Sequence, residues 1–347
     1  MSTQRPILLH CGADIRWNHD LYKTLQSKFT IVRSHSMSRQ DFIQALKNKT
    51  FGDFVAIYRP FWGTGGEMSP WNKELIDLLP SSCKIDTSAG AGFDWVDTEA
   101  LAKRGVIYCN AGAACTESVA DTAIWLILSG MRDFTYSAIA ARTCEAEKFK
   151  DAQRRAALTR NPRGHSLGII GLGKIGQSIA KKAYQSFGMN VIYNDVRRLP
   201  ESVEGEFWAK YYPDLDSMLA VADVVLVATP FGGEAVINAD KLAKMKKGSR
   251  LINIARGKLI DEKALVDALK SGHLAGAGLD VHFDEPNVNP ELAAMDNVEM
   301  LSHTAGASVD SHMGFETLGM ENILQFFETG KAISPVNLHF FEEKSKL

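Results

Sequence analysis

The sequence predicts an α/β protein with two domains, each built on a doubly wound parallel sheet. Three observations support this class. The chain has 347 residues, which is more than one ordinary hydrophobic core organises. Short apolar runs alternate with helical segments throughout, a pattern typical of parallel sheets covered by helices. Hydrophobic residues make up 45% of the chain and charged residues 23%, as in an average globular protein.

The N-terminal part of the chain predicts a first sheet. Its strand candidates are runs rich in β-branched and aromatic residues, at 6–12, 29–34, 53–60, 83–92 and 106–112. Long helices are predicted at about 116–134 and 311–329. Because these two helices bracket the centre of the chain, we expect them to return the C-terminal residues to the first domain. The predicted domains are 1–111 plus 312–347, and 112–311.

The central domain predicts a second and larger sheet. Its strand candidates lie at 166–171, 190–195, 223–230, 250–255, 276–281 and 298–303. A helix is predicted from Lys174 to Phe187, directly after the first of these strands. Another helix is expected after Asp261, an N-cap residue, and should stop at Gly272.

The segment GLGKIG places Gly171, Gly173 and Gly176 in the G-x-G-x-x-G register. A predicted strand precedes it, a helix follows, and Asp195 ends the next strand, the context of a dinucleotide-binding loop. Gly171 permits a tight turn, Gly173 lets the backbone approach a pyrophosphate, and Gly176 lets the helix pack closely on the strand. The helix N-terminus, at Lys174 and Ile175, offers N–H groups to the phosphates. The central domain is therefore predicted to have the Rossmann fold.

The choice between NAD and NADP depends on the residues that follow the second strand of this domain. The Asp195 carboxylate suits the ribose hydroxyls of NAD and would repel the 2′-phosphate of NADP. Arg197 and Arg198 follow in sequence, and either could pair with that phosphate. NAD(H) is the favoured cofactor, and NADP(H) is not excluded.

Three side chains at predicted strand ends suit hydride transfer to a keto acid. Such a reaction needs a cation for the substrate carboxylate, an acid for the developing alkoxide and a group that keeps this acid charged. Arg256, His303 and Glu285 each follow a strand, where ligands bind in open α/β sheets. An arginine also binds a planar carboxylate with two parallel hydrogen bonds.

With these residues in place, the chain resembles the D-isomer-specific 2-hydroxyacid dehydrogenase family over nearly its whole length, and fungal members of the D-mandelate dehydrogenase type in particular. The motifs that carry the resemblance are GAGFDWVD, TESVADTAIWLIL, LGIIGLGKIG, NIARGKLID, GLDVHFDEP and HTAG. Arg256, Glu285 and His303 follow one another at intervals of 29 and 18 residues, as the Arg-Glu-His triad of the family does.

The resemblance implies an activity and a role for each member of this triad. The activity is the reversible NAD(P)H-dependent reduction of a 2-keto acid to a D-2-hydroxy acid. Arg256 would bind the substrate carboxylate and carbonyl, and His303, hydrogen-bonded to Glu285, would be the acid in reduction and the base in oxidation. The first domain would be flavodoxin-like, and the protein a homodimer.

Further positions carry over from the family. Ala91 and Gly92 would offer N–H groups to the substrate carboxylate, and Asp280 would contact the nicotinamide carboxamide. The remaining cofactor positions implied by the family lie on the crossover helix and at two strand ends: Thr116 with Asp121, Thr229 with Pro230, and Ile254 with Ala255.

Two features predict different substrates. Phe61 and Trp62 lie where the family places residues that face the substrate side chain, and they favour an aromatic or branched keto acid. The chain ends in Ser345-Lys346-Leu347, the tripeptide read by the peroxisomal import receptor in a eukaryote. This address favours glyoxylate or hydroxypyruvate; in an organism without peroxisomes the protein is expected in the cytoplasm.

Several other classes are disfavoured. A net charge of −2 leaves no broad basic surface for nucleic acid, and the apolar runs are too short to cross a membrane. Five scattered cysteines without a C-x-x-C pair argue against a disulfide framework and a thiolate zinc site. A metal site at Asp280, His282 and Asp284 is also disfavoured. We expect His282 and Asp284 to be loop surface.

A competing class is a dinucleotide-sensing binding protein, like the corepressors that share this fold. Such a sensor does not need the complete triad found here. Turnover of a keto acid distinguishes the two.

Overall fold

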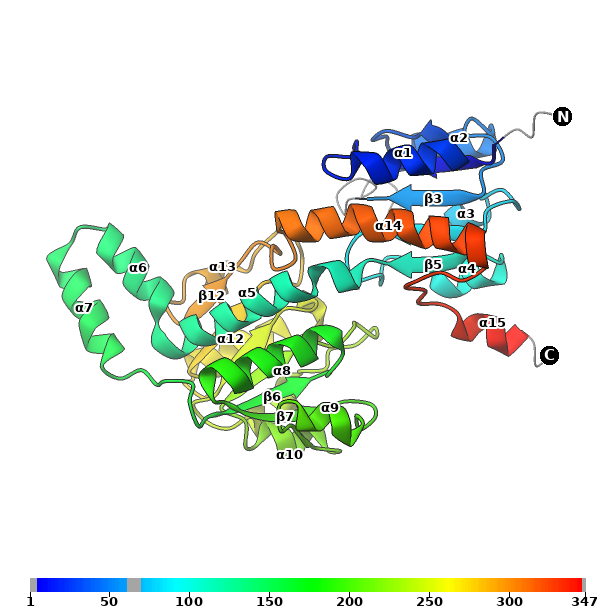
Figure 1. Cartoon of the computed structure of the whole chain (residues 1–347). Coiled ribbons are helices and arrows are strands. Elements are labelled where there is room, and N and C mark those ends of the chain that lie inside the picture. The colour runs from blue at the N-terminus through cyan, green and yellow to red at the C-terminus, as the bar shows by residue number, and fades with distance from the viewer. Residues whose placement is uncertain (1–4, 61–69, 345–347) are drawn as a thin grey trace. The chain divides into compact units, whose positions relative to one another are not determined.

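The computed structural model describes residues 5–60 and 70–344, which form two compact units (Figure 1). Unit 1 comprises Met1–Cys115 and Ala307–Leu347, and unit 2 comprises Thr116–Gly306. The predicted domains are 1–111 with 312–347 and 112–311, and their boundaries lie within a few residues of these limits. The predicted positions Phe61, Trp62 and Ser345-Lys346-Leu347 lie outside the described residues.

Unit 1 contains a five-stranded parallel sheet in the order β2-β1-β3-β4-β5. Its strands are β1 (Ile7–His10), β2 (Thr30–Arg33), β3 (Ala56–Arg59), β4 (Ile85–Ser88) and β5 (Ile107–Asn110). Each strand lies inside one of the predicted apolar runs. The predicted flavodoxin-like parallel sheet is therefore confirmed.

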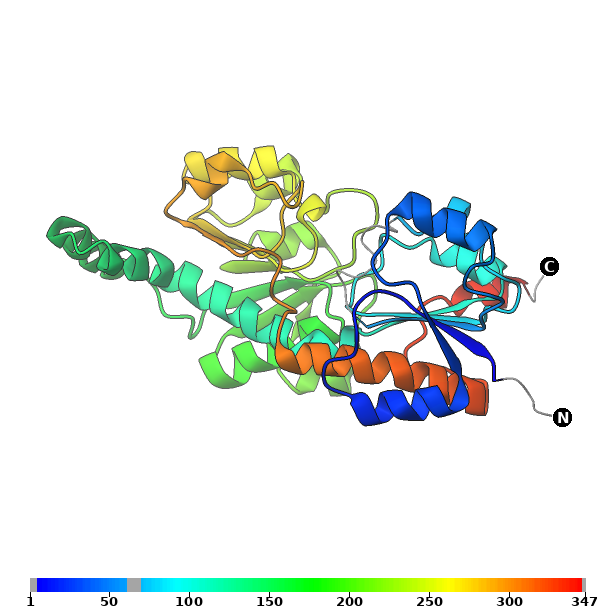
Figure 2. The same ribbon diagram turned by 90° about the horizontal axis from the view of Figure 1, so that it is seen from above.

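Helices cover both faces of this sheet, because alternate strand residues point to opposite sides. Leu8 and Tyr58 pack with Leu25 of α1 (His19–Lys28) and Ile323 of α14 (Val309–Thr329). Their strand neighbours, Leu9 for example, face α2 (Arg39–Lys47), α3 (Lys73–Ile76) and α4 (Thr98–Lys103). Figure 2 shows the blue α1 and orange α14 on one face of the unit 1 sheet. The short C-terminal helix α15 (His339–Lys344) packs against α4.

Unit 2 contains a seven-stranded parallel sheet in the order β12-β11-β10-β9-β6-β7-β8. Its strands are β6 (Ser166–Ile170), β7 (Asn190–Asn194), β8 (Lys210–Tyr211), β9 (Val224–Val227), β10 (Arg250–Asn253), β11 (Gly276–Leu279) and β12 (Val298–Met300). Six of these were predicted; β8 has two residues and gives no periodic signal. The strand order reverses between β6 and β9, and ligands bind α/β sheets at such a reversal.

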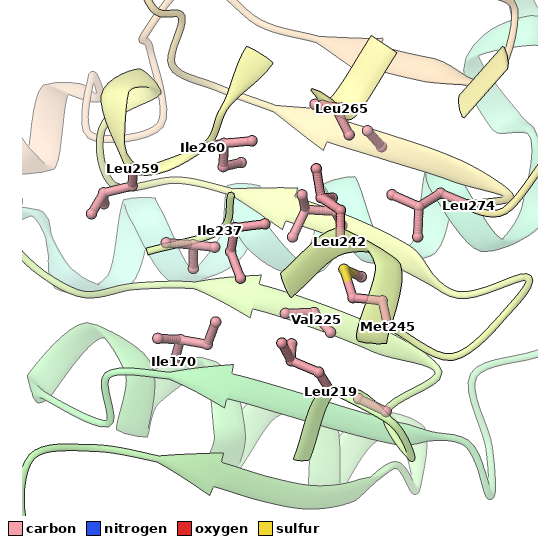
Figure 3. Packing of buried hydrophobic residues seen from close by; sticks show 14 of the residues in the cluster. Ile170, Leu219, Val225, Ile237, Leu242, Met245, Leu259, Ile260, Leu265 and Leu274 are labelled. Atoms are coloured by element: carbon pink, nitrogen blue, oxygen red, sulfur yellow. The ribbon is translucent and has the colours of Figure 1, made fainter. Parts of the chain in front are cut away.

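One face of the unit 2 sheet packs on a large apolar cluster (Figure 3). Val225 of β9 and Ile170 of β6 contribute to it from the sheet. The covering helices are α10 (Leu215–Leu219), α11 (Ala239–Lys244), α12 (Glu262–Lys270) and α13 (Pro290–Ala293), with the short helix η2 (Gly257–Leu259). The opposite face packs on α5 (Gly112–Arg132) and α8 (Lys174–Phe187); Leu126 of α5, for example, lies against Gly278 of β11.

Local chemistry accounts for the helix ends. Helix α8 has the predicted limits and ends at Gly188, which adopts the left-handed φ of +63°. The Asp261 carboxylate accepts the Ala264 N–H at the start of α12, as predicted. Helix α5 stops at Arg132, two residues before its predicted end, because Asp133 is left-handed at φ +53°.

Unit 2 has three further helices, α6 (Phe134–Arg142), α7 (Ala146–Ala156) and α9 (Glu201–Gly205). Helices α6 and α7 pack on each other as a pair beside the end of α5 (Figure 1). Within residues 5–60 and 70–344, no helix is both long and apolar enough to span a bilayer.

Candidate active site

Six strands of unit 2 bring the predicted site residues to one edge of the sheet. All strands of this sheet are parallel, so the loops after β6, β7, β9, β10, β11 and β12 leave the same edge. These loops carry the glycine motif, Asp195, Thr229, Arg256, Asp280 and His303. The edge includes the reversal between β6 and β9, where a dinucleotide is expected to bind.

The glycine loop has the close approaches that its motif predicts. Gly171 has a φ of +89°, and a Cβ there would lie 2.9 Å from the Thr229 Cα atom. A Cβ on Gly176 would lie 2.5 Å from the Gly171 carbonyl oxygen. In contrast, a Cβ on Gly173 would meet no protein atom within 4 Å. Packing therefore explains two of the glycines, and the third keeps a space open in front of α8.

This space fits a pyrophosphate. Helix α8 begins at Lys174 after the extended Gly173, and the Gln177 N–H is the first to donate to the Gly173 carbonyl, so the N–H groups of Lys174, Ile175 and Gly176 have no intrahelical acceptor. Together with the helix dipole they favour an anion. Thr229 and Pro230 follow β9 on the other side of the strand reversal, and Thr229 borders the glycine loop.

Asp195 follows β7 and is linked to the glycine loop. Its Oδ2 atom accepts the Leu172 N–H at 2.8 Å, and the Tyr211 hydroxyl donates to its carbonyl oxygen at 3.2 Å. The carboxylate is therefore held beside the loop, as the binding of an adenosine ribose requires. Val196 and Arg197, the next two residues, are exposed.

On the crossover helix, Asp121 has a protein partner. It pairs with Lys182 of α8, which also contacts Glu117 at 2.9 Å. These ion pairs connect α5 with α8 inside unit 2. Thr116 is the first residue of this unit.

The turn that carries Arg256 is organised by Asn253, a residue that sequence reasoning missed. Asn253 is buried at the end of β10; its amide donates to the Arg256 carbonyl at 2.8 Å, and its Oδ1 atom accepts the Ala255 N–H at 3.1 Å. The Arg256 guanidinium donates to the Ala255 carbonyl at 2.8 Å. The Ile254 N–H donates to the carbonyl of Val227 in β9 at 3.4 Å, so the N–H groups of both 254 and 255 have protein partners.

The structure brings this turn against the loop of Glu285. A Cβ on Gly257 would lie 2.0 Å from the carbonyl carbon and oxygen of His282, so only glycine fits there. The close approach places the residue after Arg256 on the backbone of the segment that leads to Glu285.

His303 and Glu285 form the predicted pair. The His303 Nδ1 atom lies 2.7 Å from Glu285 Oε2, and both side chains are partly exposed. The second carboxylate oxygen, Oε1, accepts the His282 N–H at 2.9 Å, which orients Glu285. With Nδ1 donating to the carboxylate, the Nε2 atom of the imidazole is the one that exchanges a proton with a ligand.

Asp280 holds the turn of His303. His303 has a φ of +54°, a strained conformation for a residue other than glycine, which is typical of functional sites. Its N–H donates to the Asp280 carbonyl at 2.7 Å. The Asp280 carboxylate accepts the N–H groups of Thr304 at 2.9 Å and Ala305 at 3.1 Å. The Asp280 side chain is buried, and this burial raises the pKa of its carboxyl group above the usual value.

The expectation that His282 lies on the loop surface is wrong. Its side chain is 7% exposed, and its Nε2–H donates to the Leu301 carbonyl at 2.7 Å. His282 therefore links the segment before Glu285 to the segment before His303. Strand β11 ends at Leu279, and His282 lies in the loop that follows it. Asp284 is exposed, as expected, and accepts from the Asn287 amide at 3.2 Å.

The predicted carboxylate-binding residues Ala91 and Gly92 belong to unit 1. They follow β4, and the Ala91 carbonyl accepts the Asn110 amide at 2.7 Å, which fixes the turn to the end of β5. Across the described parts of the chain, no group of three or more His, Cys, Asp or Glu side chains is arranged to hold a metal ion.

Comparison with known proteins gives the family. The model of the D-isomer specific 2-hydroxyacid dehydrogenase, NAD binding domain, matches residues 124–305. The apo D-mandelate dehydrogenase of Rhodotorula graminis is 40% identical, with a TM-score of 0.92 over 96% of this chain and 98% of that one. The 4-methyl-2-oxopentanoate reductase A of Aspergillus oryzae is 33% identical over 317 residues, 91% of this chain and 93% of that protein.

A third relative was solved with its ligands. The NADPH-dependent glyoxylate/hydroxypyruvate reductase of Sinorhizobium meliloti, in complex with NADP and malonate, is 32% identical, with a TM-score of 0.75 over 96% of this chain and 97% of that one. These similarities confirm the predicted resemblance to the family and to its mandelate-type members. The chain is therefore an oxidoreductase, and it belongs to the family of D-isomer-specific 2-hydroxyacid dehydrogenases.

Proposed function

We propose that this protein reduces a 2-keto acid to the D-2-hydroxy acid with NADH as the preferred cofactor. The observation that carries this proposal is the 2.7 Å contact between His303 Nδ1 and Glu285 Oε2, on the same edge of unit 2 as the Arg256 turn and the glycine loop. A dinucleotide sensor would not need this proton-transferring pair.

In this reaction the bound dinucleotide supplies the hydride to the carbonyl carbon. Arg256 binds the substrate carboxylate and polarises the carbonyl, because a guanidinium matches a planar anion with parallel hydrogen bonds. The protonated His303 gives the Nε2 proton to the carbonyl oxygen, which becomes the hydroxyl. Glu285 stabilises the imidazolium until that transfer, and in oxidation His303 takes the proton back.

The residues after β7 support NADH. The Asp195 carboxylate lies beside the glycine loop through its bond to Leu172, where the 2′-phosphate of NADPH would meet its negative charge. We expect Asp195→Ala to reduce the preference for NADH over NADPH. An unchanged preference would place the discriminating residue elsewhere, with Arg197 or Arg198 as the next candidates.

The substrate is either an aromatic or branched keto acid or else glyoxylate or hydroxypyruvate. Relatives with both kinds of name span nearly the whole chain. Phe61 and Trp62 favour the bulkier substrates. The deciding experiment measures kcat/KM for benzoylformate, 4-methyl-2-oxopentanoate, glyoxylate and hydroxypyruvate, each with NADH and NADPH. Absence of turnover with every pair would contradict the enzymatic function and favour a sensor.

We also propose a homodimer formed through the α6–α7 pair of unit 2. Large apolar side chains are exposed on this pair, including Phe134 at 45%, Ile139 at 59% and Phe149 at 53%. Exposed apolar clusters of this kind mark interaction surfaces. The mass in solution tests this: wild type should be dimeric, and Ile139→Glu with Phe149→Glu should yield monomers. A monomeric wild type would contradict the proposal.

In a eukaryotic cell, we propose peroxisomal import through Ser345-Lys346-Leu347. The tripeptide is the only support for this location. A fluorescent fusion that keeps the C-terminus free should be punctate, and deletion of Leu347 should make it diffuse. A diffuse signal from the intact chain would contradict import, and the cytoplasm would then be the site of action.

A further inference from the structure

The loop between β7 and α9 contains residues that favour different cofactors. Asp195 is suited to the ribose of NAD, whereas Arg197 and Arg198 would attract the 2′-phosphate of NADP. The residues from Arg197 to Glu201 also line a pocket in this loop. A chain that prefers NADH must therefore limit the binding of a phosphate by these arginines.

Arg198 is already engaged by a carboxylate of its own chain. Its Nε atom donates to Glu204 Oε1 at 3.0 Å, and its Nη2 atom donates to Glu204 Oε2 at 2.8 Å. The pair is bidentate, the strongest common geometry between an arginine and an anion. The Glu204 side chain is 8% exposed, although that of Arg198 is 55% exposed.

Buried neighbours fix Glu204 in this position. The hydroxyl of the buried Tyr193 donates to Glu204 Oε1 at 2.6 Å and accepts the Leu199 N–H at 2.8 Å. The bonds from Arg198 and then Tyr193 lower the pKa of Glu204, so the carboxylate stays charged at neutral pH. An anchored carboxylate cannot follow Arg198 toward a ligand, and the guanidinium would have to give up both bonds to reach one.

Arg197 has no such restraint. Its side chain is exposed, and within residues 5–60 and 70–344 it forms no ion pair. It follows Val196, which is fully exposed, so this part of the loop has little packing to hold it. The two arginines therefore differ in availability, although they are adjacent in sequence.

We propose that Glu204 is a specificity-determining residue, which withholds Arg198 from the 2′-phosphate of NADPH and so preserves the preference for NADH. This inference rests on the cofactor preference proposed above and extends it to a residue that does not touch the cofactor. Removing the charge of Glu204 should release Arg198 and convert the loop into a phosphate site.

The test uses equilibrium binding of two adenosine nucleotides to the full-length chain by calorimetry. The probe 2′,5′-ADP carries the 2′-phosphate, and 5′-AMP lacks it. Glu204→Gln keeps the shape and an acceptor for Tyr193, and should bind 2′,5′-ADP about tenfold or more tightly than wild type does, with 5′-AMP unchanged. Glu206→Gln makes the same charge change on an exposed residue after α9, and should change either affinity by less than about twofold.

Two further variants attribute the gain to Arg198. In the double variant Glu204→Gln/Arg198→Ala the gain should disappear, as a double-mutant cycle requires for coupled residues. Arg198→Ala alone should leave the affinity for 2′,5′-ADP unchanged, because the guanidinium is already engaged. The measurement on Arg198→Ala tests the proposal even if Glu204→Gln does not fold.

Three results would overturn the proposal: no gain in Glu204→Gln, a gain that survives removal of Arg198, or a loss of 2′,5′-ADP binding in Arg198→Ala alone. Failure of the proposed function has a different signature. It would be a wild-type protein that turns over no keto acid with either cofactor, whereas the binding results need no turnover.

Discussion

Replacing Asp280 with alanine tests how the strained His303 is kept in place. The Asp280 carboxylate accepts the part-buried N–H group of Thr304 and the buried N–H group of Ala305. The change leaves both donors without an acceptor, at about 1–3 kcal/mol each. Burial raises the pKa of Asp280, so the native chain already bears a cost for this carboxylate, which offsets part of the loss. We therefore expect a net loss of about 2–4 kcal/mol in the free energy of unfolding.

Asp280→Ala should also lower the catalytic rate. Without these bonds the 303–305 turn is free to relax from the left-handed φ of His303, which moves the imidazole relative to Glu285. A displacement of roughly 1 Å in a catalytic group costs about 100-fold in rate. We expect kcat to fall by about this factor, with the dissociation constant for NADH nearly unchanged.

The assay combines urea unfolding, steady-state kinetics and NADH titration. Asp284→Ala is the matched control, because it removes the same charge from an exposed residue of the same loop and should leave stability and kcat close to wild type. Wild-type kcat and stability in Asp280→Ala would refute the reasoning. A loss of NADH affinity as large as the loss of kcat would instead assign Asp280 to the nicotinamide carboxamide.

The remaining predictions concern the acid, the glycine loop and a buried histidine. His303→Ala should lower kcat by about 10²–10⁴-fold while NADH still binds, since it removes the proton donor; equal loss of NADH affinity would refute that role. Gly176→Ala should lower both Tm and the affinity for NADH, because the added Cβ meets the Gly171 carbonyl. Gly173→Ala should lower the affinity for NADH alone, because a Cβ there meets no protein atom. A wild-type Tm in Gly176→Ala would contradict this difference. Burial, and then Arg33, lowers the pKa of His10 from 6.5 to about 3, so it is neutral in the fold and charged in the unfolded chain below pH 6.5. The free energy of unfolding should therefore fall by up to about 1.4 kcal/mol per pH unit as the pH drops below 6.5. Measured by urea unfolding, this pH dependence should be shallower in His10→Gln. If the free energy of unfolding depends on pH equally in the variant and in wild type, His10 is not the cause.

Much of the scaffold could be predicted because its signals are local. The strands of both units are short apolar runs with β-branched residues, and α8 has a glycine at each end. The pairing of His303 with Glu285 came from the spacing of a family motif, and the structure confirms it at 2.7 Å.

What the sequence missed depends on contacts between distant segments. His282 is drawn inward by a carbonyl 19 positions later in the chain, that of Leu301. Asn253 acts on the backbone of the turn that follows it, and no apolar periodicity reports such bonds. The pairing of Arg198 with Glu204 depends on a helix of five residues, α9, too short to have a periodic signal.

The two-part origin of unit 1 has a consequence for how the chain is made. Helix α14 supplies Met320 and Ile323 to the core beneath β1, β3 and β4, yet these residues leave the ribosome after the whole of unit 2. On this face the nascent N-terminal sheet is therefore covered by α1 but not by α14 while the central unit is translated and can fold. Released chains that end before Val309 should accordingly present this face to chaperones, and the full-length chain should not.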